Sequence, residues 1–291
     1  MTKLTTASYV KITLIIALSL LILGSIGFGG CSAMRFGMLG GTEMGSANVD
    51  AASVKNLSVK WASGAVSIDV VDEGDDISVV DDGAGDVIEL VETAPTGLTK
   101  AQQMRWSVNG DTLSIDYGTW FSCFALGRKD LQVRIPKSYA QNLGAVEIDG
   151  ASGDYDVNGL GCETLKLKLA SGDVDGQHLQ ADELRVDVAS GQLDVEGRFA
   201  DRVDVRTASG QTRIVCREAC PKAIDADIAS GSVSVAVPES SGFTARIEKA
   251  SGRFSSSFSL SQNGNVYTSG DGSASINARL ASGEFRIDAD D

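Results

Sequence analysis

The triplet Ala-Ser-Gly recurs through this chain at a nearly fixed interval, and that interval restricts what the chain can fold into. Its central copies begin at positions 151, 170, 189, 208, 229 and 250, so the intervals are 19 or 21 residues. Further copies begin at positions 62 and 281. A period near twenty is typical of a solenoid, in which each repeat forms one rung stacked on the next.

Apolar and polar residues alternate on both sides of the triplets. Residues 165–169 read Leu-Lys-Leu-Lys-Leu and residues 184–188 read Leu-Arg-Val-Asp-Val. Such alternation indicates half-buried strands. Each rung is therefore expected to run from a strand through an Ala-Ser-Gly corner into a second strand and a polar loop. We predict an all-β fold, a single β-solenoid similar to a β-helix, with rungs of 19–21 residues over residues 54–291.

The glycines of the triplets are expected at tight corners where successive rungs approach closely. Stacked strands lie only ~4.8 Å apart, so a large side chain at a corner would collide with the next rung. Glycine also adopts the positive φ angles that tight turns need. The predicted structural corners are Gly153, Gly172, Gly191, Gly210, Gly231, Gly252 and Gly283.

The beginning of the chain differs from the repeats. Residues 1–11 are basic, and residues 12–34 carry no charge and are long enough to cross a bilayer as a helix. Lysines before an apolar segment favour a cytoplasmic N-terminus, which places the β domain outside. We expect a cell-membrane protein with 1–11 in the cytoplasm, 12–34 as a transmembrane or signal-anchor helix, 35–53 as a flexible tether and the β domain on the extracytoplasmic side.

The apolar segment fits three fates. It is an uncleaved signal anchor in a single-pass protein, a lipoprotein signal, or a secretion signal that is cleaved. The lipoprotein fate rests on residues 28–31, Phe-Gly-Gly-Cys, which resemble a lipobox. The segment departs from the lipobox pattern at Phe28, where Leu is usual, and at Gly29. In that case Cys31 is lipidated. The first two fates attach the protein to a membrane.

Composition argues against several classes of site. A formal net charge of −14 disfavours nucleic acid as a partner. The single histidine, His178, excludes metal sites that use two or more histidines. The acidic turns at 72–76 and 81–86 fit neither the EF-hand nor the glycine-rich calcium repeat. We therefore expect no catalytic, cofactor-binding or metal-binding residues.

Cysteines and aromatic residues mark two interruptions of the repeat. Outside the cytoplasm disulfides are favoured, and Cys216 and Cys220, just ahead of Pro221, are expected to form one. Residues 117–130 break the alternation. They either fold over the solenoid and bury their aromatics, or expose an aromatic patch to a glycan or protein partner. The candidate interaction residues of this loop are Tyr117, Trp120, Phe121 and Phe124.

Residues 54–290 resemble the bacterial putative adhesin family of β-strand repeat proteins, a family of unknown function. The resemblance rests on the strand-Ser-Gly-strand rungs, the strand Leu131–Pro136, the Ser-Gly-Phe that follows Pro238, and Tyr267 before a closing Ser-Gly strand. It implies a membrane-tethered protein outside the cell, linked in some members to the envelope stress response. It supplies no catalytic residues.

The expected function is that of a non-enzymatic, membrane-anchored, adhesin-like scaffold or binding module with an envelope protein or glycan as its unidentified partner. The alternative is a polysaccharide-active enzyme that uses paired carboxylates on a β-helix. Stacking would place Asp154 over Asp173, one rung apart. Acids that alternate regularly with apolar residues are, however, typical of a solvated face.

Overall fold

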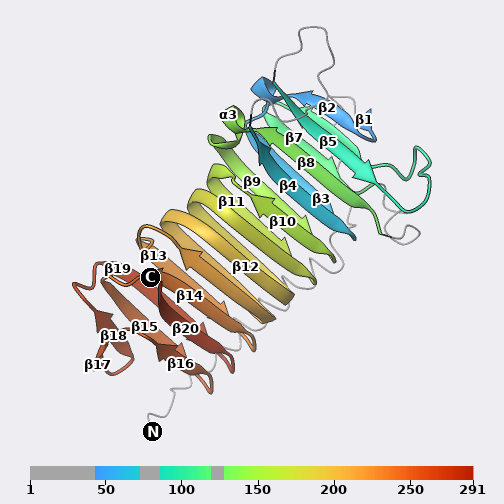
Figure 1. The fold of residues 1–291 in the computed structure, drawn as a ribbon. Helices are drawn as coiled ribbons and strands as arrows, with labels where there is room; N and C mark the ends of the chain where they lie inside the picture. Colours follow the sequence, from blue (N-terminus) through green and yellow to red (C-terminus); the bar gives the residue numbers. More distant parts are fainter. Residues whose placement is uncertain (1–42, 73–85, 119–127, 291) are drawn as a thin grey trace.

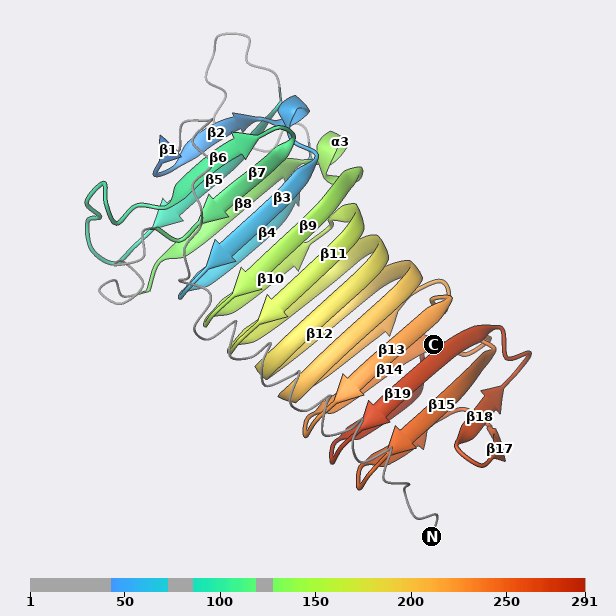
Figure 2. The same ribbon diagram turned by 180° about the vertical axis from the view of Figure 1, so that it is seen from behind.

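The computed structural model describes residues 43–72, 86–118 and 128–290, and these form a long β-solenoid (Figure 1, Figure 2). Its body consists of two parallel sheets, one on each side of the core. The first sheet, here the β9 face, stacks β7 (Thr112–Asp116), β3 (Asn56–Trp61), β9 (Leu143–Gly150), β11 (Gly161–Leu169), successive stretches of β12 (Asp173–Cys216), β13 (Ala223–Ile228), β19 (Ala274–Leu280) and β15 (Phe243–Lys249).

The second sheet, here the β10 face, follows the same stacking order. It consists of β8 (Asp130–Pro136), β4 (Ala65–Val71), β10 (Asp154–Asn158), further stretches of β12, β14 (Ser232–Pro238), β20 (Glu284–Asp290) and β16 (Arg253–Ser256). The all-β solenoid predicted from the repeat period is thus the observed fold of the described residues.

The stacking order departs from the chain order at both ends of the solenoid. The first rung of the chain, β3–β4, lies between β7–β8 and β9–β10 (Figure 1). The last rung, β19–β20, lies between β13–β14 and β15–β16. Each inserted rung is therefore paired on both sides, and the end rungs of the solenoid come from inside the sequence.

Antiparallel strands cover much of the two ends. On one end β5 (Val87–Thr93) pairs with β8 and β2 (Ala47–Asp50) pairs with β5, while β6 (Arg105–Asn109) pairs with β7 and β1 (Glu43–Met44) with β6. On the other, β18 (Val266–Ser269) pairs with β15 and β17 (Ser261–Asn263) with β18. The helices within the described residues are short: η1 (Ala51–Ser53) and α3 (Lys137–Ala140).

One predicted boundary is wrong. Residues 43–53, assigned to the flexible tether, form β1, β2 and η1 instead. Val49 and Ala51 are buried, and the main chain of 47–50 bonds to β5, so this segment belongs to the folded domain. Alternation over so short a stretch is too weak to recognise in the sequence. The rest of the tether, the apolar segment 12–34 and Cys31 lie outside the described residues. Within the described ranges no helix is long and apolar enough to cross a membrane.

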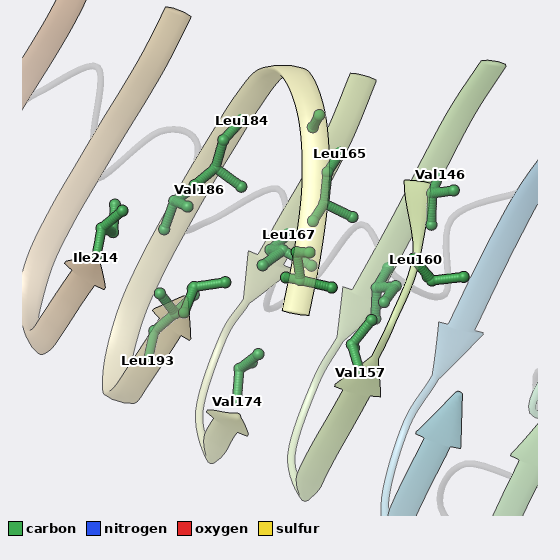
Figure 3. Packing of buried hydrophobic residues seen from close by; sticks show 14 of the residues in the cluster. Val146, Val157, Leu160, Leu165, Leu167, Val174, Leu184, Val186, Leu193 and Ile214 are labelled. Atoms are coloured by element: carbon green, nitrogen blue, oxygen red, sulfur yellow. The ribbon is translucent and has the colours of Figure 1, made fainter. Parts of the chain in front are cut away.

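The core lies between the two faces and repeats from rung to rung. Val146, Leu165 and Leu184 occupy one column of the β9 face, and each is at most 1 % exposed (Figure 3). Each buried aliphatic side chain stabilises the fold by roughly 1.5–3 kcal/mol relative to exposure. Stacking therefore completes a core that no single rung could form.

A buried ion pair closes the core at the end where β7 and β8 lie. Lys129 and Glu92 are 2.5 Å apart from Nζ to Oε1, with side chains 1 % and 3 % exposed. The ammonium also donates to the carbonyls of Gln102 and Tyr117 and lies over the rings of Trp61 and Tyr117. Because every donor of the ammonium has a partner, the charge is tolerated inside the protein.

Candidate binding groove

The corner glycines form a continuous ladder along the solenoid. In space their order is Gly64, Gly153, Gly172, Gly191, Gly210, Gly231, Gly283 and Gly252. A Cβ on Gly172 would lie 2.1 Å from the carbonyl oxygen of Gly153, and a Cβ on Gly283 would lie 2.2 Å from that of Gly231. The close approach of the neighbouring carbonyl therefore requires glycine at each corner.

The corner conformation changes partway along the ladder. Gly153, Gly172 and Gly191 have φ angles of 141°, 112° and 116°, in the region that favours glycine. Gly210, Gly231, Gly283 and Gly252 are not among the glycines with positive φ. The change coincides with the step from intervals of 19 residues to intervals of 21. In the second half of the ladder it is therefore contact alone, and not φ, that excludes larger residues.

The serines of the triplets lie side by side on the outside of this corner. Their main chains are held to the preceding rung, as in the bond from Ser230 N to Ala208 O at 2.9 Å. The Ser251 and Ser282 hydroxyls donate to the carbonyls of Ala281 and Ala229. Ser209 and Ser230 are exposed, and no described residue accepts or donates a hydrogen bond to their hydroxyls. These two hydroxyls are available to a ligand.

A shallow groove of about 650 Å³ follows the second half of the corner. It crosses five rungs, which corresponds to a length of ~19 Å at the strand spacing of ~4.8 Å. Its lining contains hydroxyl, amide, carboxylate and guanidinium groups and backbone, but no aromatic or aliphatic side chain. The lining residues are Gly191, Gln192, Ser209, Gly210, Gln211, Ser230, Gly231, Ser232, Ser251, Arg253, Ser282, Gly283 and Glu284.

The charges of the groove lie at one end. Glu284 and Arg253 occupy equivalent positions on neighbouring rungs, and neither forms an ion pair with another described residue. Toward the other end the same column holds the neutral Ser232, Gln211 and Gln192. The groove is thus neutral and hydrogen-bonding over most of its length.

An acidic area lies beyond the groove on the β10 face. Asp154 stacks on Asp173 and Asp156 on Asp175, as the sequence predicted for the first pair. Desolvation raises the pKa of Asp156, and the negative charges of Asp175 and Asp154 raise it further. None of these four aspartates lines the groove. Across the described ranges, no group of three or more His, Cys, Asp or Glu side chains is arranged to hold a metal ion.

The predicted interaction loop is only partly described. Tyr117 is 6 % exposed, and its ring packs edge-on against Trp61 with centroids 5.0 Å apart. It therefore takes part in the end closure around Lys129, and the exposed-patch interpretation is wrong for this residue. Trp120, Phe121 and Phe124 lie outside the described residues.

The cysteines differ from the expectation. Cys216 and Cys220 are free thiols in the structure, and so is Cys162, so the expected Cys216–Cys220 disulfide is not formed. Cys216 is fully buried in the core, and the Cys220 Sγ donates to the carbonyl of Pro221. Burial raises the pKa of Cys220 to about 11, which keeps the thiol protonated and unreactive.

Sequence reasoning placed the corner glycines correctly in the rungs but did not find the groove. One signal was present. The residue after each corner glycine changes from Asp154 and Asp173 to Gln192, Gln211 and Ser232. This loss of charge along one column marks where the groove lies. Its hollow shape depends on the corner conformation, which the residue types alone do not specify.

Comparison with known proteins supports the predicted resemblance. A family model described as Toastrack DUF4097 matches residues 89–219, so the resemblance to a β-strand repeat family of unknown function is confirmed. Comparison with curated proteins gives no match.

Two solved structures are similar to the chain. One is of a putative cell adhesion protein from Clostridium sporogenes, with 12 % identity and a TM-score of 0.38 over 87 % of this chain and 100 % of that one. The other is of a putative adhesin from Bacteroides fragilis, with 12 % identity and a TM-score of 0.39 over 88 % of this chain and 100 % of that one.

Proposed function

We propose that the protein is a non-enzymatic, adhesin-like binding scaffold that holds an extended polar polymer, of the class of glycan chains, along the corner groove. The observation that carries the proposal is the groove itself, which is long, open and lined only by polar groups and backbone. Pockets for small molecules are mostly apolar and enclosed. A polar channel across several rungs suits a chain that presents a hydroxyl group at regular intervals.

The chemistry of the groove matches such a ligand. Ser209 and Ser230 offer hydroxyls that both donate and accept hydrogen bonds, and Gln211 offers an amide. Sugar hydroxyls have the same dual character. Repetition from rung to rung lets several weak contacts act on one chain, which raises the overall affinity.

The arrangement gives less support to the alternative, a polysaccharide-active enzyme. Such an enzyme needs two carboxyl groups that converge on one bond of the substrate. The groove contains a single carboxylate, Glu284, and the stacked pair Asp154 and Asp173 lies outside its lining. A scaffold that binds without cleaving needs no such pair.

The cellular placement in this proposal follows from the amino-terminal sequence. The uncharged segment 12–34 would anchor the protein as a single-pass helix or deliver Cys31 for lipidation, with the solenoid on the extracytoplasmic side. The solenoid axis would then carry the groove away from the membrane. A cell-envelope glycan or a protein of the envelope is the partner that such a position makes accessible.

Affinity electrophoresis with soluble glycans tests the proposal. The full chain is run in gels that contain glycol chitin, hydroxyethyl cellulose or soluble peptidoglycan fragments, and its retardation is measured. Ser230→Phe fills the groove without touching the core, because Ser230 is exposed. We expect retardation of the parent by at least one glycan and loss of that retardation in Ser230→Phe.

Ser171→Phe is the matched control. Ser171 is an exposed serine at the same corner position, three rungs away and outside the groove. It should leave retardation unchanged. Migration of the parent unaffected by all three glycans, or an equal loss in both variants, would contradict the assignment of the groove.

A further inference from the structure

One outward column of the β9 face changes charge at every rung. Its members lie two positions before each Ala-Ser-Gly triplet, and the column continues onto β7 and β6 at one end. In stacking order they are Arg105, Asp116, Lys60, Asp149, Lys168, Asp187, Arg206, Asp227, Arg279 and Glu248. We call this set the alternating column. Each basic residue has acidic neighbours, and each acidic residue has basic ones.

Direct contacts occur within the column. Arg279 lies 2.5 Å from Asp227, between Nε and Oδ1, and Arg206 lies 3.5 Å from Asp187, between Nη1 and Oδ1. Opposite charges directly across neighbouring strands stabilise the pairing, and like charges there destabilise it. The order of the rungs therefore matters to the electrostatic energy of this column.

The alternation exists only because the terminal rungs are inserted. If the rungs stacked in chain order, β7 would lie between β3 and β9, and Asp116 would lie next to Asp149. At the other end β15 would lie directly on β13, and Asp227 would face Glu248. Chain-order stacking thus creates one contact between two acids at each end of the solenoid, and the observed order creates none.

The corners and the core of the rungs discriminate weakly between the two orders. The antiparallel strands at the ends fit only the inserted order, because β6 occupies the outer edge of β7 and β18 that of β15. The corner of every rung has the same triplet, so Gly252 and Gly283 are interchangeable as neighbours of Gly231. The core columns are apolar in each rung, so Ile224 would meet Ala245 in one order and Ile276 in the other. Repeats that are alike in corner and core need other properties to fix their order, and charge can add to the pairing of the end strands.

We propose that the alternating column is a conformational device that, together with the antiparallel end strands, favours the inserted stacking order over the chain order. It disfavours the chain order, because that order places acids side by side at both ends. Burial raises the pKa of Asp116 and of Asp149 in this column, so an acid placed beside Asp149 would be more unfavourable than on a fully exposed surface.

Charge exchange at the carboxyl-terminal end tests the device. In Arg279→Glu/Glu248→Arg the composition is unchanged, but the observed order now places the introduced glutamate on Asp227, whereas the chain order places the introduced arginine there. Glu248→Arg alone gives one like-charge contact in either order. The three proteins therefore form a series in which the electrostatic preference of the column moves from the inserted order, through neutral, to the chain order.

Cysteine reporters on the opposite face read the stacking order. Ser234 on β14 is paired with Arg286 on β20, and Ser255 on β16 lies one rung further out. With cysteines at positions 234, 286 and 255, a disulfide from 234 to 286 marks the inserted order and one from 234 to 255 marks the chain order. Adjacent strands lie within disulfide reach at ~4.8 Å, and strands two rungs apart at ~9.6 Å do not.

Each protein is unfolded in urea, refolded, oxidised after refolding and analysed by peptide mass spectrometry. We expect the ratio of the 234–255 to the 234–286 disulfide to rise through the series, by at least about fivefold between parent and double variant. We also expect 1 M salt to reduce that rise, because salt screens exposed charges.

Glu284→Arg/Arg253→Glu is the matched control. It exchanges one acid and one base between the same two rungs, but on the β10 face, where the neighbouring residue is the neutral Ser232. It should leave the ratio at the parent value. An unchanged ratio in both Glu248→Arg and the double variant, or an equal rise in the control, would overturn the proposal. Should the double variant fail to refold, the comparison of Glu248→Arg with parent and control decides.

Discussion

Arg279 and Asp227 form a bidentate ion pair although 52 residues separate them in the sequence. Nε donates to Oδ1 at 2.5 Å and Nη2 donates to Oδ2 at 2.9 Å. The pair joins β19 to β13 and so connects the inserted last rung to the rung beneath it. It is a contact that only the inserted order provides.

Arg279→Ala should lower the free energy of unfolding by about 1 kcal/mol. A bidentate ion pair that is partly buried contributes more to stability than an ordinary surface ion pair. Urea denaturation followed by circular dichroism measures the change. Arg253→Ala, which removes an exposed arginine without an ion-pair partner, should be nearly neutral. Equal losses in the two variants would mean that the ion pair contributes nothing specific.

Gly191→Ala should destabilise the solenoid by more than ~3 kcal/mol, because a residue with φ of 116° acquires a Cβ 1.9 Å from the carbonyl oxygen of Gly172. Differential scanning calorimetry should show a clear drop in Tm. Gly97→Ala is the control, since a Cβ there meets nothing within 4 Å. A parent-like Tm for Gly191→Ala would refute the stacked-corner geometry.

Glu92→Gln should cost about 3 kcal/mol. The substitution keeps the shape of the side chain but leaves the ammonium of Lys129 buried without a counter-charge. Glu89→Gln, on the same strand, breaks the ion pair between Glu89 and Arg134. The two side chains are 16 % and 34 % exposed, respectively, so the loss of this pair should cost much less. Chemical denaturation compares them. Similar losses would show that Lys129 is effectively hydrated.

Asp156→Asn should stabilise the protein by about 0.5 kcal/mol at pH 7, because it removes like-charge contacts with Asp175 and Asp154. The pKa of Asp156 is raised, so the folded state binds a proton more readily than the unfolded state. The ionised carboxylate therefore lowers stability at neutral pH, and this penalty disappears as pH falls below the ordinary value of 3.8. The advantage of Asn should vanish over the same range.

Asp194→Asn provides the opposite sign for comparison. Asp194 lies three residues after its corner glycine, as Asp156 does, but it is paired with Arg213 at 3.0 Å. Its neutralisation should weaken the protein slightly at pH 7. Urea midpoints at pH 7 and pH 3 report both effects. If both substitutions stabilise the protein, the gain comes from the reduced net charge and not from the local contacts.

Much of the architecture follows from the sequence because period and alternation act locally. Residues 165–169 alternate and form part of β11, and the triplet glycines such as Gly172 lie at the corners between strands. The same signals could not give the stacking order, because Gly252 and Gly283 belong to the same triplet, and the triplet does not indicate which of them lies on Gly231. Order is a property of pairs of rungs, and it becomes visible only when charges such as Asp227 and Glu248 are compared across them.

The candidate site was harder to predict for a related reason. The triplet serines were recognised as corner residues, but the groove over Ser209 and Ser230 arises where the corner conformation changes along the ladder. For Tyr117 the sequence left burial and exposure open, and the structure buries it, because its partners Trp61 and Lys129 are distant in sequence and leave no local signal. Burial by residues from other rungs leaves little local trace.

The insertion of the last rung also determines how the protein would respond to mechanical load. β20 ends at Asp290 and is paired with β14 on one side and β16 on the other, and Asp290 is held by Arg217 at 2.5 Å. A terminal rung at the end of a solenoid can peel away one hydrogen bond at a time. Here residues 284–287 of β20 are paired on both sides, so unravelling past residue 288 must break two ladders at once, and the inserted rung resists being pulled out of the solenoid.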